Sequence, residues 1–397
     1  MQDRDSQQSV PSTRNKPKTS AQIVTAESVQ AEEVPTIPIG SMQTVNALQP
    51  EIAIHDISST TSMRLPAPLI VHPEEYRRSP GEWLRIWWNG IRPSYLPLSL
   101  LPLLLGSALA WIQSITPASL RGNFHPQRFV ALLLAILLLQ IGAHLVNDYY
   151  DFVHGIDTTN SLGPGGLIQQ GFIKPVSVLT LGLVMLGIGA LCGLLVLTAT
   201  GSVLLLTIIL FGLFCAYFYS ATSHSLSSIA LGELISYLLF GPLLTMSAYL
   251  VQTGQINYTV LLYSLSPGLL AAAFIHLNNM RDAESDAQAG KHTLASLLGL
   301  RLSRLIYLLL LFGAYAPIIA LGLPHHGPHL ILITLWTLPG LVVLISGVTR
   351  TDAPASLHLH MQKTLKLEAL FILLLLAALI ITAYWPLAHL PSISLPF

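Results

Sequence analysis

Long apolar stretches follow one another along the chain from about residue 94, separated by short polar segments. Nine of them have the length of roughly 17 to 25 residues that an α-helix needs to cross a bilayer. They cover residues 94–114, 129–146, 178–198, 201–218, 229–251, 258–277, 302–323, 330–348 and 365–387. This pattern predicts an all-α polytopic membrane protein, with nine transmembrane helices around a central cavity.

Residues 1–80 follow a different pattern, rich in Ser, Thr, Gln and Pro, with no apolar periodicity that could bury a core. Such a composition is typical of a disordered polar tail. The transmembrane domain is therefore expected to cover residues 81–397. Because the tail lacks the features of a signal peptide, the first span is expected to direct the chain to the membrane.

Between the tail and the first span lies the segment GEWLRIWWNGIRPSYLP, which begins at Gly81 and combines three tryptophans with two arginines. Aromatic and cationic side chains together are typical of a helix at the level of the lipid headgroups.

The composition supports a membrane protein. The chain has 397 residues, of which 52% are hydrophobic and only 10% are charged, whereas a soluble domain carries about 25% charged residues. Nineteen basic and nineteen acidic residues cancel, so nothing points to a nucleic-acid partner bound through its phosphates. The two cysteines, Cys192 and Cys215, lie in apolar stretches and are expected to be inert thiols.

The basic residues orient the predicted spans. If the N-terminal tail is cytoplasmic, the inside loops after the first span hold Lys174, Arg281, Lys291, Arg301, Arg304, Arg350, Lys363 and Lys366. Only Arg121 and Arg128 then lie outside. Because inside loops carry an excess of Lys and Arg, we expect a multi-pass protein of the cell membrane with its N-terminus in the cytoplasm, its C-terminus outside and its cavity opening at the cytoplasmic face.

The acidic residues gather in two motifs on this predicted cytoplasmic side. Nine acids follow residue 90, and six of them belong to two short stretches. The first motif, NDYYDFVHGID at residues 147–157, contains Asp148, Asp151 and Asp157; the second motif, NNMRDAESDAQAGKHT at residues 278–293, contains Asp282, Glu284 and Asp286. Carboxylates beside hydrocarbon are costly and usually face a cavity where they have a function.

The spacing within each motif predicts paired carboxylates. Asp148 and Asp151 are three residues apart, and Asp282 and Asp286 are four apart, so each pair is expected to project from one face of a helix end. A divalent cation would remove the repulsion within a pair. Mg²⁺ is typically held by one or two carboxylates together with the phosphate oxygens of a substrate.

The substrate's other end is expected to be lipid-like, because the cavity walls would be apolar. A polyprenyl diphosphate has both properties. The departure of diphosphate would leave an allylic cation that needs a dry pocket. The rings of Tyr149, Tyr150 and Phe152 are candidates to stabilise that cation, although the tyrosines also fit an interfacial aromatic belt.

The two motifs resemble those of the UbiA superfamily of intramembrane prenyltransferases, and more closely the 1,4-dihydroxy-2-naphthoate prenyltransferases of menaquinone synthesis. The segments GIRPSYLPLSLLPLLLGSALA, LGELISYLLFGPL and KTLKLEALFILLLLAAL are similar to the family in order and spacing. The resemblance covers the chain from about residue 83 onward. It implies attack of an aromatic ring on the prenyl cation, with loss of the ring carboxylate if the acceptor is dihydroxynaphthoate.

The resemblance also implies roles for particular residues. The metal carboxylates would be Asp148, Asp151, Asp157, Asp282 and Asp286, supported by Asn147. The candidates for contact with diphosphate or acceptor would be Arg92, Asn279 and Lys291. In one departure from the related sequences, Gly166 stands where they usually carry an Arg, which predicts that one cationic contact is absent.

Other interpretations remain open at this point. The same scaffold could use homogentisate, hydroxybenzoate, a chlorin or a glycerol phosphate as acceptor. A CDP-alcohol phosphotransferase would need one long acidic motif with Asp-Gly and Ala-Arg elements, which the sequence lacks. A transporter would carry ionisable groups near the bilayer midplane, whereas these acids gather at one face.

Further polar residues lie near the predicted site. Glu233, just inside the fifth predicted span, is expected to face the cavity. No spacing gives a partner to His144, His154, His276 or His292, which favours structural roles for them.

Overall fold

The computed structural model describes residues 78–384, apart from residues 116–123, 156–163, 223–224 and 324–327. All of them belong to one compact unit, Pro73–Phe397. The predicted disordered tail and Asp157 lie outside the described residues.

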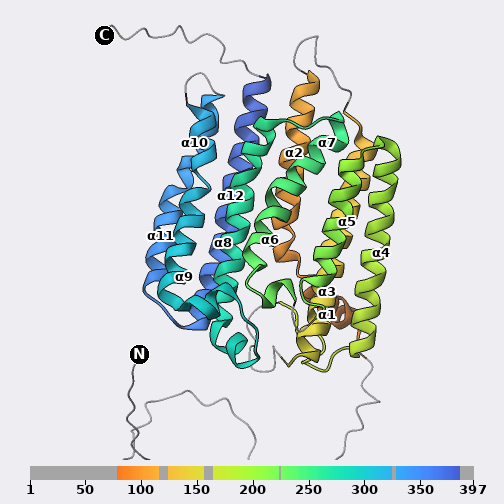
Figure 1. The fold of residues 1–397 in the computed structure, drawn as a ribbon, viewed down its shortest axis with the longest axis vertical. Helices are drawn as coiled ribbons and strands as arrows, with labels where there is room; N and C mark the ends of the chain where they lie inside the picture. The colour runs from red at the N-terminus through yellow and green to blue at the C-terminus, as the bar shows by residue number, and fades with distance from the viewer. Residues whose placement is uncertain (1–77, 116–123, 156–163, 223–224, 324–327, 385–397) are drawn as a thin grey trace, which may run out of the picture. The chain divides into compact units, whose positions relative to one another are not determined.

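The described residues are helical almost throughout (Figure 1). The helices are α1 (Pro80–Ile91), α2 (Pro97–Ile115), α3 (Pro126–Val153), α4 (Pro175–Thr200), α5 (Val203–Phe218), α6 (Gly232–Leu238), α7 (Leu244–Thr253), α8 (Tyr258–Gln288), α9 (Leu294–Gly313), α10 (Ala316–Gly322), α11 (Leu338–Thr349) and α12 (Pro354–Tyr384). A π-helical turn, Leu239–Leu243, joins α6 to α7, and 3-10 segments cover Pro93–Tyr95, Leu226–Ser228 and His329–Thr337. Within these ranges the backbone forms no β-strand, only one isolated bridge between Ile229 and His292.

Most of the predicted spans are confirmed as apolar helices. Eight helical segments of the described chain are long and apolar enough to cross a membrane. The segment predicted at residues 201–218 forms α5, whose 16 residues are fewer than the others have. At about 1.5 Å per residue, this helix is shorter than the hydrocarbon core. The number of nine membrane crossings therefore stays a prediction.

Two helices extend beyond their apolar stretches and carry the acidic motifs. Helix α3 begins with Pro126, a residue favoured in a first helical turn, and continues to Val153. Helix α8 begins after Asn257, whose side chain caps the backbone amides of Thr259 and Val260, and continues to Gln288. The four described aspartates of the motifs, Asp148, Asp151, Asp282 and Asp286, thus lie at helix ends, as the spacing predicts.

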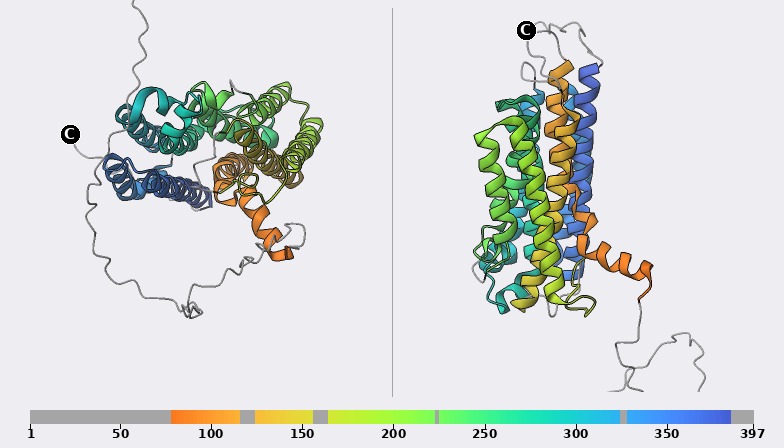
Figure 2. Two further views of the ribbon diagram at one scale, coloured as in Figure 1. Left: turned by 90° about the horizontal axis from the view of Figure 1, so that it is seen from below. Right: turned by 90° about the vertical axis from the view of Figure 1, so that its right-hand side faces the viewer.

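Helix α1 lies at the edge of the bundle of long helices, where its buried Ile86 packs in one cluster with Leu145 of α3. Its first turn is closed by a capping box, in which Ser79 and Glu82 each bond the other's backbone amide. The helix extends outward from the N-terminal end of α2 (Figure 2). It exposes the side chains of Trp83 and Trp88. The predicted helix is confirmed, and its location at the headgroups stays a prediction.

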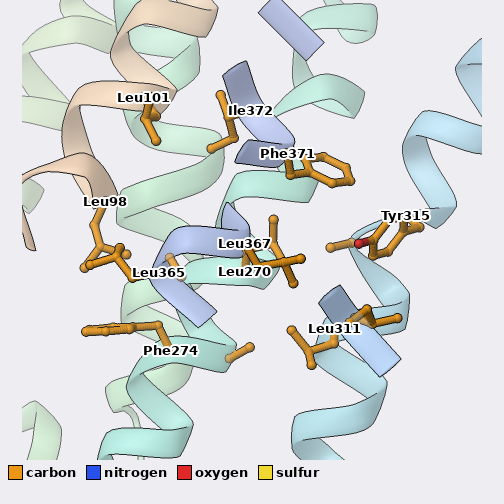
Figure 3. Close-up of a cluster of buried hydrophobic side chains, with 14 of the residues drawn as sticks. Leu98, Leu101, Leu270, Phe274, Leu311, Tyr315, Leu365, Leu367, Phe371 and Ile372 are labelled. Carbon is orange, nitrogen blue, oxygen red and sulfur yellow. The ribbon is translucent and has the colours of Figure 1, made fainter. Parts of the chain in front are cut away.

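The main hydrophobic core lies between α2, α8, α9 and α12 (Figure 3). Phe371 of α12 meets Tyr315 edge-on, with ring centroids 5.1 Å apart. The Tyr315 hydroxyl lies 2.6 Å from that of Thr337, so this buried polar group is satisfied. The side of the bundle built by α8–α12 is thereby filled with side chains, and the remaining space lies on the side that α2–α8 surround.

Glycines allow helices to pack closely on the side of the bundle that surrounds the remaining space. A Cβ on Gly142 of α3 would lie 2.8 Å from the carbonyl oxygen of Gly182 on α4. A Cβ on Gly241, in the π-helical turn, would lie 2.6 Å from the Cα of Gly268 on α8. Small residues at such crossings let membrane helices pack backbone to backbone, which brings α3 against α4 and the α6–α7 segment against α8.

Candidate active site

A cavity of about 560 Å³ lies among α2, α3, α4, α5, α6, α7 and α8. This volume is within the range of roughly 300–1,000 Å³ found for small-molecule sites. Its polar lining includes Asn147, Asp151, Asp282, Asp286 and Lys291, and its apolar lining includes Leu132, Leu139, Leu205, Ile209 and Leu244. One space therefore combines both acidic motifs with hydrocarbon walls.

The first motif presents Asn147 and Asp151 to this cavity. The two residues are one helical turn apart on α3, and the Asn147 amide nitrogen donates to the Asp151 carboxylate. The Ser220 hydroxyl, just after α5, donates to the Asn147 carbonyl oxygen at 2.8 Å. These two bonds fix the orientation of the Asn147 amide and hold Asp151 toward the cavity.

Asp148 has a different environment from Asp151. Its side chain is 0% exposed and is absent from the cavity lining, and it accepts a hydrogen bond from the Arg92 guanidinium. Arg92 itself lines the cavity. The two predicted partners, Asp148 and Asp151, are therefore separated: one anchors a cation and the other faces the space. A metal-binding role for Asp148 stays a prediction.

Gly165 packs directly on the Arg92–Asp148 pair. A Cβ at this position would lie 2.5 Å from an Arg92 guanidinium nitrogen and 2.9 Å from an Asp148 carboxylate oxygen. Its φ of +117° is also one that favours glycine. Close contact between this loop and the ion pair therefore depends on the missing side chain. The next residue, Gly166, also lines the cavity and is the position where the sequence predicts that a cation is missing. Arg92 lines the same cavity and supplies a cation from another part of the chain.

In the second motif, Arg281 holds Asp282. The Arg281 Nε donates to the Asp282 carboxylate at 2.7 Å, and a terminal nitrogen donates to the Asn278 carbonyl oxygen at 3.0 Å. All three residues line the cavity. The guanidinium thereby neutralises Asp282 and fixes the amide of Asn278.

The second carboxylate of this motif, Asp286, is buried and pairs with Lys291, whose ammonium lies 3.3 Å away. The turn after α8 places Lys291 there, because its backbone amide donates to the Asp286 carbonyl oxygen at 2.8 Å. Burial alone would lower the pKa of Lys291, but the nearby carboxylates, Asp286 first and then Asp151, outweigh burial and raise it above its usual value. Lys291 is therefore a permanent cation at neutral pH.

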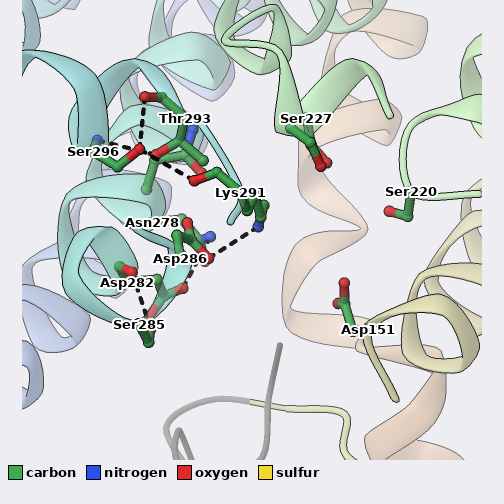
Figure 4. A network of polar contacts seen from close by, with 12 residues as sticks. Asp151, Ser220, Ser227, Asn278, Asp282, Ser285, Asp286, Lys291, Thr293 and Ser296 are labelled. Carbon is green, nitrogen blue, oxygen red and sulfur yellow. Dashed lines mark hydrogen bonds and ion pairs between the residues drawn. The ribbon is translucent and has the colours of Figure 1, made fainter. Parts of the chain in front are cut away.

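The two motifs lie on opposite sides of the cavity (Figure 4). Asp151 and Ser220 are on one side, and Asp282, Asp286 and Lys291 are on the other. No group of three or more His, Cys, Asp or Glu in the described part of the chain is arranged to hold a metal ion by itself. The donors are nonetheless hard oxygens. Such a set fits Mg²⁺ that arrives with phosphate oxygens of its own.

The remaining predicted residues divide between the cavity and the packing around it. Asn279 lines the cavity. Tyr149 does not: it packs on a small cluster that includes Leu145, and its ring meets that of Tyr150 edge-on. Glu233, expected to face the cavity, is instead absent from its lining and hydrogen-bonds to His276.

Sequence reasoning missed three residues that shape this site. Arg281 could have been found, because it stands directly before Asp282 within the motif. Ser220 and Gly165 lie in no acidic motif, so nothing in the sequence marks them as part of the site. Their importance comes from contacts with residues at least 17 positions away in the chain.

Comparison with known proteins identifies the family. The model of the UbiA prenyltransferase family matches residues 99–367. The 1,4-dihydroxy-2-naphthoate octaprenyltransferase of Bacillus subtilis is 30% identical over 300 residues, which cover 76% of this chain and 94% of that protein. The UbiA prenyltransferase domain-containing protein 1 of Danio rerio is 38% identical over 226 residues, 57% of this chain and 65% of that protein.

A solved structure shares the fold. The UbiA homologue from Archaeoglobus fulgidus, bound to GPP and Mg²⁺, aligns with a TM-score of 0.54 at 18% identity, over 74% of this chain and 99% of that one. Together with the family match over more than half of the sequence, this places the chain, as the acidic motifs indicate, in the UbiA prenyltransferase family, and the protein is a prenyltransferase.

Proposed function

We propose that this prenyltransferase moves a polyprenyl group from a polyprenyl diphosphate to 1,4-dihydroxy-2-naphthoate, in a Mg²⁺-dependent step of menaquinone biosynthesis. The observation that carries the proposal is that both acidic motifs and hydrocarbon walls line the same cavity. The acceptor is chosen because the Bacillus subtilis relative, 94% of which is covered, is named for that substrate.

Four cavity-lining residues would hold the metal ions: Asn147, Asp151, Asp282 and Asp286. When bound, Mg²⁺ neutralises the charge that develops on the leaving diphosphate. The archaeal homologue is described as bound to GPP and Mg²⁺, which supports the proposal of a prenyl diphosphate and Mg²⁺ in this site. Asp148 is assigned a positioning role here, because it is fully buried against Arg92.

The chain's own cations bind the diphosphate. Lys291 and Arg281, both in the second motif, line the cavity, and Arg92 lines it beside the first motif. Each now pairs with a carboxylate of the protein. In the proposed complex, diphosphate oxygens would share these cations, and the carboxylates would be free to hold the metal ions. The site is thus close to electrically balanced both with and without its substrate.

The reaction breaks the bond between C1 of the prenyl group and the diphosphate oxygen, and the electron pair leaves with diphosphate. A ring carbon of the acceptor then supplies the electron pair for the new bond to C1. With dihydroxynaphthoate, that ring carbon is the one that bears the carboxylate: the bond to the carboxylate breaks, CO₂ leaves, and the electron pair of that bond restores the aromatic ring. The apolar lining excludes water from the allylic cation, so the aromatic ring is the nucleophile that captures it.

A screen of acceptors tests the proposal. Purified protein with Mg²⁺ and one labelled polyprenyl diphosphate should prenylate dihydroxynaphthoate, and homogentisate, hydroxybenzoate, a chlorin and a glycerol phosphate should react at least about a hundredfold more slowly, since a site built to hydrogen-bond its substrate rejects a poor match strongly. EDTA should stop turnover, and added Mg²⁺ should restore it. Preference for another acceptor would overturn the naphthoate assignment, and turnover in EDTA would overturn the metal dependence.

The apolar end of the cavity gives a prediction about chain length. Gly212 of α5 lines the cavity, and a Cβ added there would meet no atom within 4 Å. We expect Gly212→Phe to shorten the preferred prenyl chain by one or more isoprene units, because the added ring occupies volume that the chain needs. Mass spectrometry of products formed from a mixture of prenyl diphosphates would measure the shift.

The matched control is Gly187→Phe. Gly187 is exposed on α4, is absent from the cavity lining and also has open space at its Cβ. The Gly187→Phe variant should therefore leave the product distribution unchanged. An unaltered distribution in Gly212→Phe, or an equal shift in both variants, would contradict the prediction.

A further inference from the structure

A buried polar cluster, which the proposed function does not use, lies beside the second motif. Glu233, in the first turn of α6, is 7% exposed, and His276 of α8 is 0% exposed. His276 Nδ1 lies 2.8 Å from Glu233 Oε1, and the Asn279 amide nitrogen donates to the same oxygen at 3.0 Å. Of these three residues only Asn279 lines the cavity. The cluster therefore connects to the site through one side chain.

The imidazole of His276 is held from both sides. Its Nε2 lies 2.9 Å from the carbonyl oxygen of Ser303 on α9. A carbonyl oxygen only accepts, so Nε2 carries a hydrogen. One further proton lies between Nδ1 and Glu233 Oε1, because two acceptors would not approach to 2.8 Å without it. The ring thus keeps the Glu233 carboxyl group in one position against α8.

This fixed carboxyl group determines which way the Asn279 amide faces. The nitrogen of the amide donates to Glu233 Oε1. In a flipped amide, the Asn279 carbonyl oxygen would face the Glu233 oxygen, and two acceptors repel. With the nitrogen held on Glu233, the groups of the Asn279 amide that remain for a molecule in the cavity are its second N–H and its carbonyl oxygen, and the carbonyl oxygen can only accept a hydrogen bond.

We propose that Glu233 and His276 orient Asn279 so that its side-chain carbonyl oxygen accepts a hydrogen bond from a hydroxyl group of the aromatic acceptor. The inference rests on the proposed function and deepens it, because it names the part of the acceptor that is recognised. A diphosphate offers only acceptor oxygens at neutral pH, so it has no group that this carbonyl oxygen could bind. Asn279 is then a contact of the acceptor, and Glu233 and His276 are positioning residues.

The first test compares Michaelis constants. In Glu233→Gln the side chain keeps its shape but loses its charge, and we expect the KM for the hydroxylated acceptor to rise about tenfold, the loss expected of one uncharged hydrogen bond. The KM for the prenyl diphosphate and the Mg²⁺ dependence should each stay within twofold. Glu233→Asp, which retains the carboxylate, should recover part of the loss.

The matched control is Ser303→Ala. It removes a buried hydroxyl from the same α8–α9 contact and keeps the backbone carbonyl that His276 binds. Its KM for the acceptor should equal that of the wild type. Equal losses in Ser303→Ala and Glu233→Gln would reduce the cluster to a packing role and overturn the proposal.

The second test uses competitive inhibitors and so needs no turnover by the variant. Two non-reacting acceptor analogues are compared, one with a hydroxyl group and one with hydrogen in its place. Wild-type protein should bind the hydroxylated analogue about tenfold more tightly, and Asn279→Ala should bind the two equally. A preserved tenfold preference in Asn279→Ala would overturn the proposal. A raised requirement for Mg²⁺ in Asn279→Ala, with the preference intact, would assign the carbonyl oxygen to the metal instead.

These outcomes are separate from failure of the proposed function. If dihydroxynaphthoate is not the acceptor, the screen described above shows it directly in the wild type, and the analogues are then built on the aromatic acceptor that reacts. If only a non-aromatic acceptor reacts, both proposals fail together, and the wild-type screen alone reveals it.

Discussion

Replacement of Asp151 or Asp286 by Asn should lower kcat/KM on the order of a thousandfold, similar to the loss of a group that stabilises developing charge in other active sites. Both carboxylates line the cavity, from opposite motifs. Asn keeps the size of the side chain but removes the charge that would bind Mg²⁺. A coupled assay for released diphosphate would measure the loss.

The control for this prediction lies in the same motif. Glu284 is an exposed acid on α8, two residues before Asp286, and is absent from the cavity lining. Glu284→Gln should retain full activity. Wild-type turnover in both aspartate variants would show that the carboxylates are not the metal ligands, whereas a similar loss in Glu284→Gln would point to the overall charge of the motif.

Replacement of Arg92 by Ala should destabilise the protein by about 3–5 kcal/mol, because it leaves the Asp148 carboxylate buried without its cation. Asp148 is fully buried, and the guanidinium of Arg92 donates to it. The same variant should raise the KM for the prenyl diphosphate, since Arg92 also lines the cavity. Thermal unfolding in detergent and steady-state kinetics would measure the two effects.

A double-mutant cycle separates stability from binding. In an Asp148→Asn background the buried charge is gone, so Arg92→Ala should cost much less stability but should still weaken diphosphate binding. Arg85→Ala provides the control, because Arg85 is exposed on α1. Additive losses of stability in the cycle would mean that the ion pair does not couple the two residues.

Much of the fold could be predicted from hydropathy, since a bilayer requires long apolar helices. The positions of the apolar stretches agree with the helices to within a few residues at most boundaries. The largest differences are at α12, which begins at Pro354 rather than at residue 365, and at α8, which ends at Gln288 rather than at residue 277. Both extensions are polar, and hydropathy detects only the part of a helix that is apolar.

The candidate site was predictable in its composition but not in its geometry. The acidic motifs, Asn279 and Lys291 were all expected, and all except Asp157, which lies outside the described residues, can be placed. The separation of Asp148 from Asp151 could not be foreseen. It depends on Arg92, 56 residues away in the chain, and on a loop that contacts the pair through Gly165.

The sequence by itself determined the class of the protein, the identity of its acidic motifs and its relation to a family, because each depends on residue types and short spacings. Only the tertiary structure decided which face of each helix meets the cavity. In a soluble helix an apolar stripe reveals the buried face, but a membrane helix is apolar on every side, and lipid is as apolar as the core. For this reason the pairing of Arg92 with Asp148, and the orientation that Glu233 gives to Asn279, became visible only when the helices were packed together.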